Sequence, residues 1–203
     1  LRYADVTSDA SVVSPSMYSH GIATADINGD GFTDVLVTGY GGLQLLCNQG
    51  DGSFVDRTTE FGLVDDSWSS SAAWFDLEGD GDLDLYVTHY VDWSWRNHPT
   101  CPASKPGLID ICSPNDFASL PDMIYLNQGN GKFKPSGREL GLENDGKGLG
   151  VVAAHFNGDN HIDLYVANDT RSNFLYLNSG DHHLKNVGLI SGTAVDADGT
   201  PNG

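Results

Sequence analysis

The sequence predicts an all-β protein that forms part of a β-propeller, with four-stranded antiparallel sheets as blades. An acidic, glycine-containing loop recurs at residues 26–34, 76–84 and 155–163, and each copy runs into an alternating, β-rich segment. Asx-Gly turns flanked by strand residues recur at 48–54 and 127–133, with a variant at 178–184. Repeats of about fifty residues with this content are typical of propeller blades.

The repeats define the expected blades. We expect about three of them, near residues 21–70, 71–147 and 148–190, with partial blades at 1–20 and 191–203. Residues 3–20 are expected to hold the last strand of a preceding unit, because residues 3–7 resemble residues 54–58. Because propellers typically close with 4 to 8 blades, we expect the chain to be part of a larger propeller. The missing blades would come from a continuation of the chain or from other chains.

The second unit carries an insertion at residues 91–120 that is too rich in proline for regular structure. Cys101 and Cys112 bracket a loop within it and are expected to form a disulfide, while Cys47 lies in a strand-like segment and is expected to be free. A zinc site at the cysteine pair is the alternative, although no second pair of Cys or His stands nearby at ligand spacing. A disulfide favours a secreted, periplasmic or cell-surface location.

Charge limits the partners. The 203 residues, enough for one domain, include 10 Lys and Arg against 28 Asp and Glu, for a formal net charge of −18. This charge disfavours nucleic acid and anionic membrane surfaces. No apolar run approaches membrane-spanning length and the first residues lack signal-peptide architecture, so we expect no direct membrane insertion. Cations are the natural partner.

The acidic loops have the ligand spacing of a calcium loop. Oxygens at loop positions 1, 3, 5 and 9, with the position 7 carbonyl, can converge on one hard cation, and glycine at position 6 permits the sharp turn. An EF-hand is disfavoured because position 12 is Val37, Val87 or Val166 where an EF-hand has glutamate, and because strands follow the loops. Magnesium is disfavoured because it usually keeps several waters.

The ligand assignments follow from these positions. Loop one offers Asp26, Asn28, Asp30 and Asp34 with the Phe32 carbonyl; loop two offers Asp76, Glu78, Asp80 and Asp84 with the Asp82 carbonyl; loop three offers Asn157, Asp159 and Asp163 with the His161 carbonyl. We expect two Ca²⁺ ions, with a third site weaker or vacant because His155 stands at position 1. Asn160 replaces the position 6 glycine, and asparagine tolerates the left-handed conformation. The alternative is that these residues form Asx turns that need no metal.

Several motifs resemble known families. The loops, the turns of the type Asn-x-Gly-Asp-Gly-x-Phe and the Gly-Leu pairs at 62–63, 141–142 and 188–189 resemble FG-GAP/VCBS repeats, the calcium-binding blades of integrin alpha chains. Residues 90–93, 101–114, 165–170 and 194–202 are similar to the ASPIC/UnbV family, which includes bacterial secreted proteins and animal cartilage acidic protein. The resemblance implies a secreted or cell-surface calcium-binding propeller that serves adhesion or assembly.

We therefore expect a non-enzymatic scaffold that binds a protein or a glycan. Trp93 and Trp95 in the insertion form either an exposed aromatic ledge for such a partner or a cover for the disulfide loop. An accessory subunit of a larger extracytoplasmic assembly and a polysaccharide lyase or hydrolase are the alternatives. His20, His89, His98, His182 and His183 are interpreted as surface or turn residues, because no nucleophile motif accompanies them.

Overall fold

The computed structural model describes residues 2–12, 17–105 and 107–201. Within them, three four-stranded antiparallel sheets confirm the predicted fold class. The first sheet consists of β1 (Tyr18–Ala25), β2 (Asp34–Tyr40), β3 (Gly42–Asn48) and β4 (Phe54–Asp56). Parts of the expected partial blades 1–20 and 191–203, and Pro106 of the insertion, lie outside the described residues.

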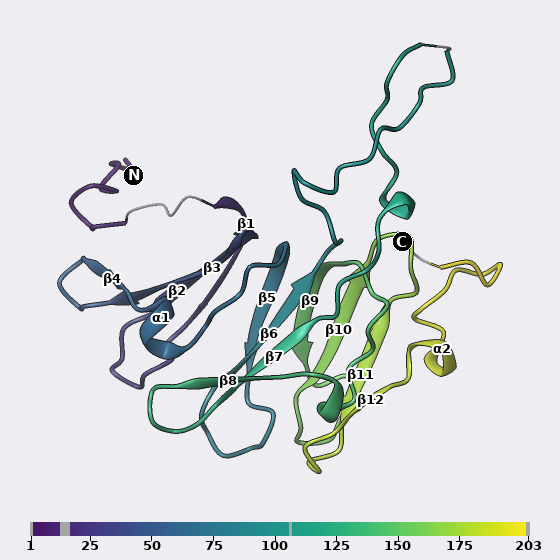
Figure 1. Ribbon diagram of the computed structural model, residues 1–203. Coiled ribbons are helices and arrows are strands. Elements are labelled where there is room, and N and C mark those ends of the chain that lie inside the picture. The colour runs from purple at the N-terminus through teal and green to yellow at the C-terminus, as the bar shows by residue number, and fades with distance from the viewer. Residues whose placement is uncertain (1, 13–16, 106, 202–203) are drawn as a thin grey trace.

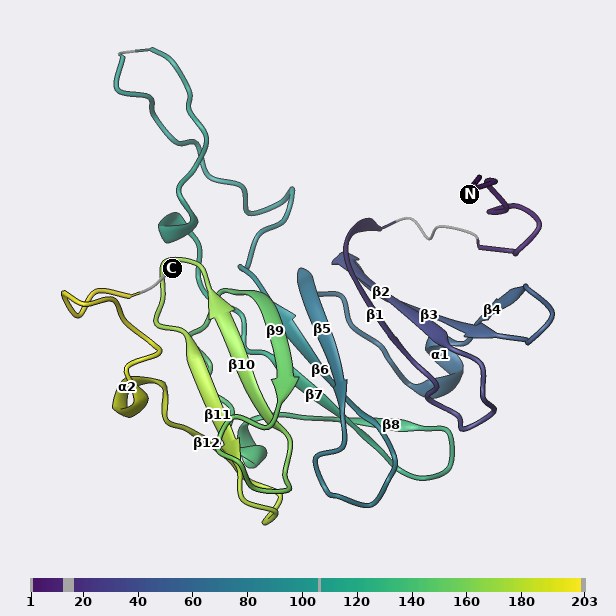
Figure 2. The same cartoon turned by 180° about the vertical axis from the view of Figure 1, so that it is seen from behind.

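The other two sheets repeat the same order of strands. The second consists of β5 (Ser69–Phe75), β6 (Asp84–His89), β7 (Met123–Asn127) and β8 (Phe133–Ser136). The third consists of β9 (Gly148–Ala154), β10 (Asp163–Asn168), β11 (Phe174–Asn178) and β12 (Leu184–Asn186). The sheets stand side by side like blades, with β5 between β1 and β9, as the two opposite views show (Figures 1 and 2).

The strand expected at residues 3–7 is absent from the described part of the chain, and turns occupy residues 7–11. The Asp5 carboxylate accepts both the backbone N–H and the hydroxyl of Thr7, and this Asx turn bends the chain out of an extended path. The segment still contacts the first sheet, because the Ala10 carbonyl accepts the N–H of Phe54 at the start of β4. The expectation of a strand at this position was therefore wrong.

Short helical turns follow the outer strands. They are α1 (Thr58–Phe61), η2 (Arg138–Leu140) and α2 (Gly188–Ser191), with η1 (Pro114–Asp116) in the insertion. Gly62 and Gly141 end their turns at φ of 79° and 92°, and the leucine that follows each of them is buried. Gly188 instead begins α2, and Leu189 is exposed. The third Gly-Leu pair therefore does not have the structural role of the first two.

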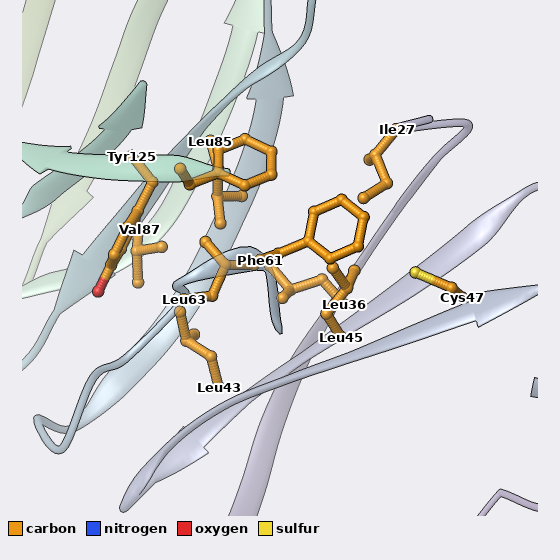
Figure 3. Close-up of a cluster of buried hydrophobic side chains, with 11 residues drawn as sticks. Ile27, Leu36, Leu43, Leu45, Cys47, Phe61, Leu63, Leu85, Val87 and Tyr125 are labelled. Carbon is orange, nitrogen blue, oxygen red and sulfur yellow. The ribbon is translucent and has the colours of Figure 1, made fainter. Parts of the chain in front are cut away.

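The core lies between neighbouring sheets, because alternate residues of a strand point to opposite faces. In β6, Leu85 and Val87 pack against the first sheet, while Tyr86 packs against the third. Figure 3 shows the cluster between the first two sheets, where Leu85 and Val87 meet side chains that include Leu45 of β3. Burying one such aliphatic side chain stabilises the fold by about 1.5–3 kcal/mol.

Cys47 belongs to this cluster as a free, buried thiol. Burial raises its pKa to about 12, so the thiolate is disfavoured. Cys101 and Cys112 form a disulfide with an S–S distance of 2.06 Å, as expected. Because this bond uses both sulfurs, it argues against the zinc alternative.

The insertion projects from one end of the sheets (Figure 1). A bridge between Val91 and Ser119 closes its base, and the disulfide holds its distal hairpin, where Pro102 pairs with Ile109. None of the helices in the described ranges has the length and apolar character needed to cross a bilayer.

Candidate functional site

The three acidic loops lie at one end of the sheets, each joining the first strand of a sheet to its second strand (Figure 1). Position 9 of each loop is the first residue of the strand that follows. Asp34, Asp84 and Asp163 occupy this position and are 1%, 2% and 0% exposed. They are the most buried of the predicted ligands, so their surroundings are fixed by the fold.

The position 9 carboxylate bonds the backbone in the same way in each sheet. In the second sheet, the two oxygens of Asp84 accept the N–H of Leu77 at 2.9 Å and the N–H of Asn127 at 2.8 Å. Asp34 and Asp163 receive equivalent bonds from loop position 2 and from the end of the third strand. This aspartate therefore ties the loop to the sheet whether or not it also binds a metal.

Burial raises the pKa of Asp84 to about 6, against the opposing effect of its two backbone hydrogen bonds, and the charges of Glu78 and Asp76 raise it further. The pKa of Asp34 is raised for the same reasons, with Asp30 and Asp26 as the neighbouring charges. Loops one and two thus concentrate negative charge around a buried carboxylate. A bound cation would relieve this repulsion.

Position 1 organises the exposed part of loops one and two. The Asp26 carboxylate accepts the N–H groups of Asp30 and Gly31 at 3.1 and 2.8 Å. The Asp76 carboxylate does the same for Asp80 and Gly81 at 3.2 and 2.9 Å. Each loop therefore curls around its first carboxylate.

Position 6 requires glycine in these two loops. Gly31 and Gly81 have φ of 87° and 93°, in the left-handed region that disfavours a side chain. Asn160, which occupies position 6 in loop three, does not adopt this conformation, because the non-glycine residues with positive φ in the described chain are Ser11, Thr170 and His182. Loop three therefore takes a different backbone path at this position.

Loop three also differs at position 1. Nδ1 of His155 lies 2.8 Å from the carbonyl oxygen of His161, which is the position 7 carbonyl. Since a carbonyl can only accept, this nitrogen carries the proton and donates. The ring N–H thus contacts the His161 carbonyl oxygen, which is the predicted carbonyl ligand of loop three.

The donor chemistry of loops one and two fits calcium, because carboxylate, amide and backbone oxygens are its preferred ligands. The loop carboxylates are not drawn together, however. Among the described residues, the one group of three His, Cys, Asp or Glu ligand atoms within 4.8 Å of one another is Cys101, Cys112 and Asp116, whose sulfurs form the disulfide. Binding would require the loop oxygens to move closer together. Loop three fits less well, since an imidazole N–H stands where an oxygen is needed.

A second candidate site lies at the opposite end of the sheets, where the insertion starts. It is a cavity of about 560 Å³ lined mainly by aromatic side chains from the first two sheets and the insertion. The lining residues are Met17, Tyr18, His20, Tyr40, Gly41, Trp68, Trp93 and Trp95.

The aromatic rings of this cavity are steeply inclined to one another. Trp93 lies 5.6 Å from Trp68 at 60°, 5.1 Å from Tyr40 at 59° and 5.1 Å from Trp95 at 64°, measured between ring centroids and planes. Trp68 and Tyr40 meet at 5.6 Å and 77°. Such tilted and edge-to-face contacts are the favoured geometries of aromatic pairs.

Two imidazoles fix the indoles. Nε1 of Trp68 donates to Nε2 of His20 at 2.9 Å, and Nε1 of Trp93 donates to Nδ1 of His98 at 2.8 Å. An indole N–H can only donate, so each imidazole accepts through an unprotonated nitrogen and is neutral in this arrangement.

Trp93 and Trp95 therefore lie together, and they have different surroundings. Trp95 is 82% exposed, while Trp93 is half-buried and also lines a cavity of about 270 Å³ with Cys112. The sequence interpretation missed Tyr40 and Trp68. The available signal was their position at strand ends that antiparallel pairing brings to the same edge of the sheets.

His89 was wrongly interpreted as a surface or turn residue, since it is 3% exposed. Its Nε2 lies 2.8 Å from Oδ2 of Asp65 and its Nδ1 lies 2.5 Å from the carbonyl of Pro121. Because both nitrogens face acceptors, the ring is a buried imidazolium. Burial lowers the pKa of His89, but the hydrogen bond and charge of Asp65 raise it more. For Asp65, burial also disfavours the charged form and so raises the pKa. The hydrogen bond and charge of His89 outweigh this effect and lower the pKa of Asp65 to about 2.

The sequence of the chain matches the model of a protein family. The model of the FG-GAP-like repeat matches residues 5–87 and 107–166, which is well over half of the chain. A search of curated proteins gave no match.

Proposed function

The chain belongs to the FG-GAP-like repeat family, and from this premise we propose that it is a calcium-stabilised, exported propeller that serves as a binding scaffold. FG-GAP repeats indicate a propeller-type binding or adhesion scaffold. A disulfide together with these repeats is typical of extracellular proteins. Calcium, export and the partner are the parts of the proposal that go beyond family membership.

The proposal of calcium binding rests on the structure that loops one and two share. In both, an oxygen-rich loop curls around its first carboxylate and is anchored by a buried aspartate that begins the next strand. Bound Ca²⁺ would be held by the oxygens assigned above and would neutralise the clustered charge. We propose two ions, with loop three weaker or vacant.

A non-enzymatic role is supported by the structural roles of the loop carboxylates and of His89. The regular repetition of the carboxylates is accounted for by loop structure, and His89 is buried in an ion pair instead of facing a cleft. We propose a protein or glycan partner for the scaffold. Participation in a larger extracytoplasmic assembly, including chains that complete the propeller, is the second possibility.

We also propose the narrower assignment to the ASPIC/UnbV family. Two segments that carry that resemblance meet in space, because the hydroxyl of Tyr90 donates to the Asp169 carboxylate across the second and third sheets. The two segments therefore form one contact in the folded chain, which supports a shared structural role.

Thermal unfolding of the purified chain with calcium, with magnesium and with chelator tests the metal. We expect a calcium-specific rise in midpoint with about two ions bound per chain, because a ligand that binds only the folded state stabilises it. An unchanged midpoint with calcium would instead show that the loops are metal-free Asx turns. The enzyme alternative would then have to be examined.

A further inference from the structure

The aromatic cavity has the composition of a ligand site that the repeats do not account for. Its volume of about 560 Å³ lies in the range typical of small-molecule pockets, roughly 300–1,000 Å³. Its lining residues come from β1 and the residue before it, from the end of β2 and the residue after it, from the segment before β5 and from the insertion. We propose that this cavity binds a small organic cation with a quaternary ammonium group, of the choline type.

The ring geometry favours a compact group. Coplanar rings would form a flat platform, but Tyr40, Trp68 and Trp93 are inclined at 59° to 77° to one another and form corners. A roughly spherical trimethylammonium group can contact several such rings at once. The negative ring faces attract a cation, and quaternary ammonium recognition by aromatic residues uses this attraction.

The two indole N–H groups near the cavity already have partners. The N–H groups of Trp68 and Trp93 are already used by His20 and His98. They are therefore not free to bind the oxygens of an anion or a sugar. Both imidazoles are neutral in this arrangement, so neither adds positive charge that would repel a cation.

Charge favours a cation as well. The formal net charge of −18 raises the local concentration of cations near the surface. The described residues that line the cavity include no acidic, lysine or arginine side chain, so this attraction comes from the field of the whole chain.

The test is a titration of the full chain with choline and with its neutral isostere 3,3-dimethylbutan-1-ol, followed by calorimetry and tryptophan fluorescence. We expect choline to bind about tenfold more tightly, because a desolvated cation–π contact has about this effect. Trp95→Ala should weaken choline binding about fivefold or more without changing the unfolding midpoint, since this side chain is exposed. Ile190→Ala, an exposed apolar residue in α2, is the matched control and should leave binding unchanged.

Equal binding of choline and the isostere would overturn the proposal and show a merely apolar cavity. Absence of choline binding, or binding that Trp95→Ala does not alter, would overturn it as well, and so would tight binding of a neutral oligosaccharide in place of choline. The inference shares with the proposed function only the premise of a binding scaffold. Because the calcium test reads the unfolding midpoint and the ion count, failure of one proposal is distinguishable from failure of the other.

Discussion

Nδ1 of His155 donates to the carbonyl oxygen of His161 at 2.8 Å, across loop three. In loops one and two the residue at the position of His155 is an aspartate, and its carboxylate accepts backbone N–H groups from the far side of the loop. The imidazole therefore replaces an acceptor with a donor. The direction of hydrogen bonding at position 1 is therefore opposite to that in the loops where we propose calcium binding.

Substituting His155→Asp should convert loop three into a third calcium site. The carboxylate would supply the missing oxygen at position 1 and release the His161 carbonyl from its hydrogen bond. Metal counting on the purified variant should then give about one more ion per chain than the parent protein, and the calcium-induced rise in midpoint should increase.

His183→Asp provides the control, because it adds the same charge at an exposed turn of the same sheet. It should leave the ion count unchanged. An equal gain in both variants would mean that general charge, and not position 1, governs binding. No gain in His155→Asp would show that the backbone at Asn160 prevents the loop from closing on a cation.

Removing the Asp84 side chain should destabilise the fold with or without calcium. Asp84→Ala leaves the buried N–H groups of Leu77 and Asn127 without their acceptor, which costs about 2–4 kcal/mol in the free energy of unfolding. Urea denaturation in chelator and in calcium measures the two contributions separately.

Asp80→Ala is the comparison, because this carboxylate is exposed at position 5 of the same loop. It should have little effect in chelator and should reduce the stabilisation by calcium. If Asp84→Ala were harmless in chelator, the anchoring role of position 9 would be wrong.

The buried pair of Asp65 and His89 should give a defined pH dependence of stability. The raised pKa of His89 means that its contribution is fully present below the ordinary value of 6.5 and is lost as pH rises through the raised value. The lowered pKa of Asp65 means that its contribution is present above 3.8 and is lost as pH falls toward 2. The pair therefore contributes most between about pH 4 and 6.5.

Asp65→Asn should accordingly destabilise the protein by about 3–5 kcal/mol at pH 5.5, because it leaves a buried charge without its partner. The difference should shrink at pH 9. Denaturation of parent and variant across this range measures it, with His182→Gln as a control at an exposed pair with Glu78. A difference that stays constant with pH would show that His89 is not charged in the folded protein.

Reducing the disulfide should loosen the insertion without unfolding the sheets. Cys101 and Cys112 hold the hairpin that projects from the sheets (Figure 1). The two core clusters lie between the sheets, and Figure 3 shows the first of them. Limited proteolysis should therefore cut within residues 99–118 after reduction, with only a small change in the unfolding midpoint. A cooperative loss of the whole fold on reduction would contradict this separation.

The sequence alone determined the three blades, the loops between their first two strands, the turns and the disulfide, because these features depend on local spacing. The hydrogen bonds of the Asp26 carboxylate to Asp30 and Gly31 reach only four and five positions along the chain, so this pattern can be read from the sequence. The burial of His89 and the aromatic cavity were decided by the tertiary structure. His20 and Trp68 are 48 residues apart, and only the packing of one sheet against the next brings their rings within hydrogen-bonding distance.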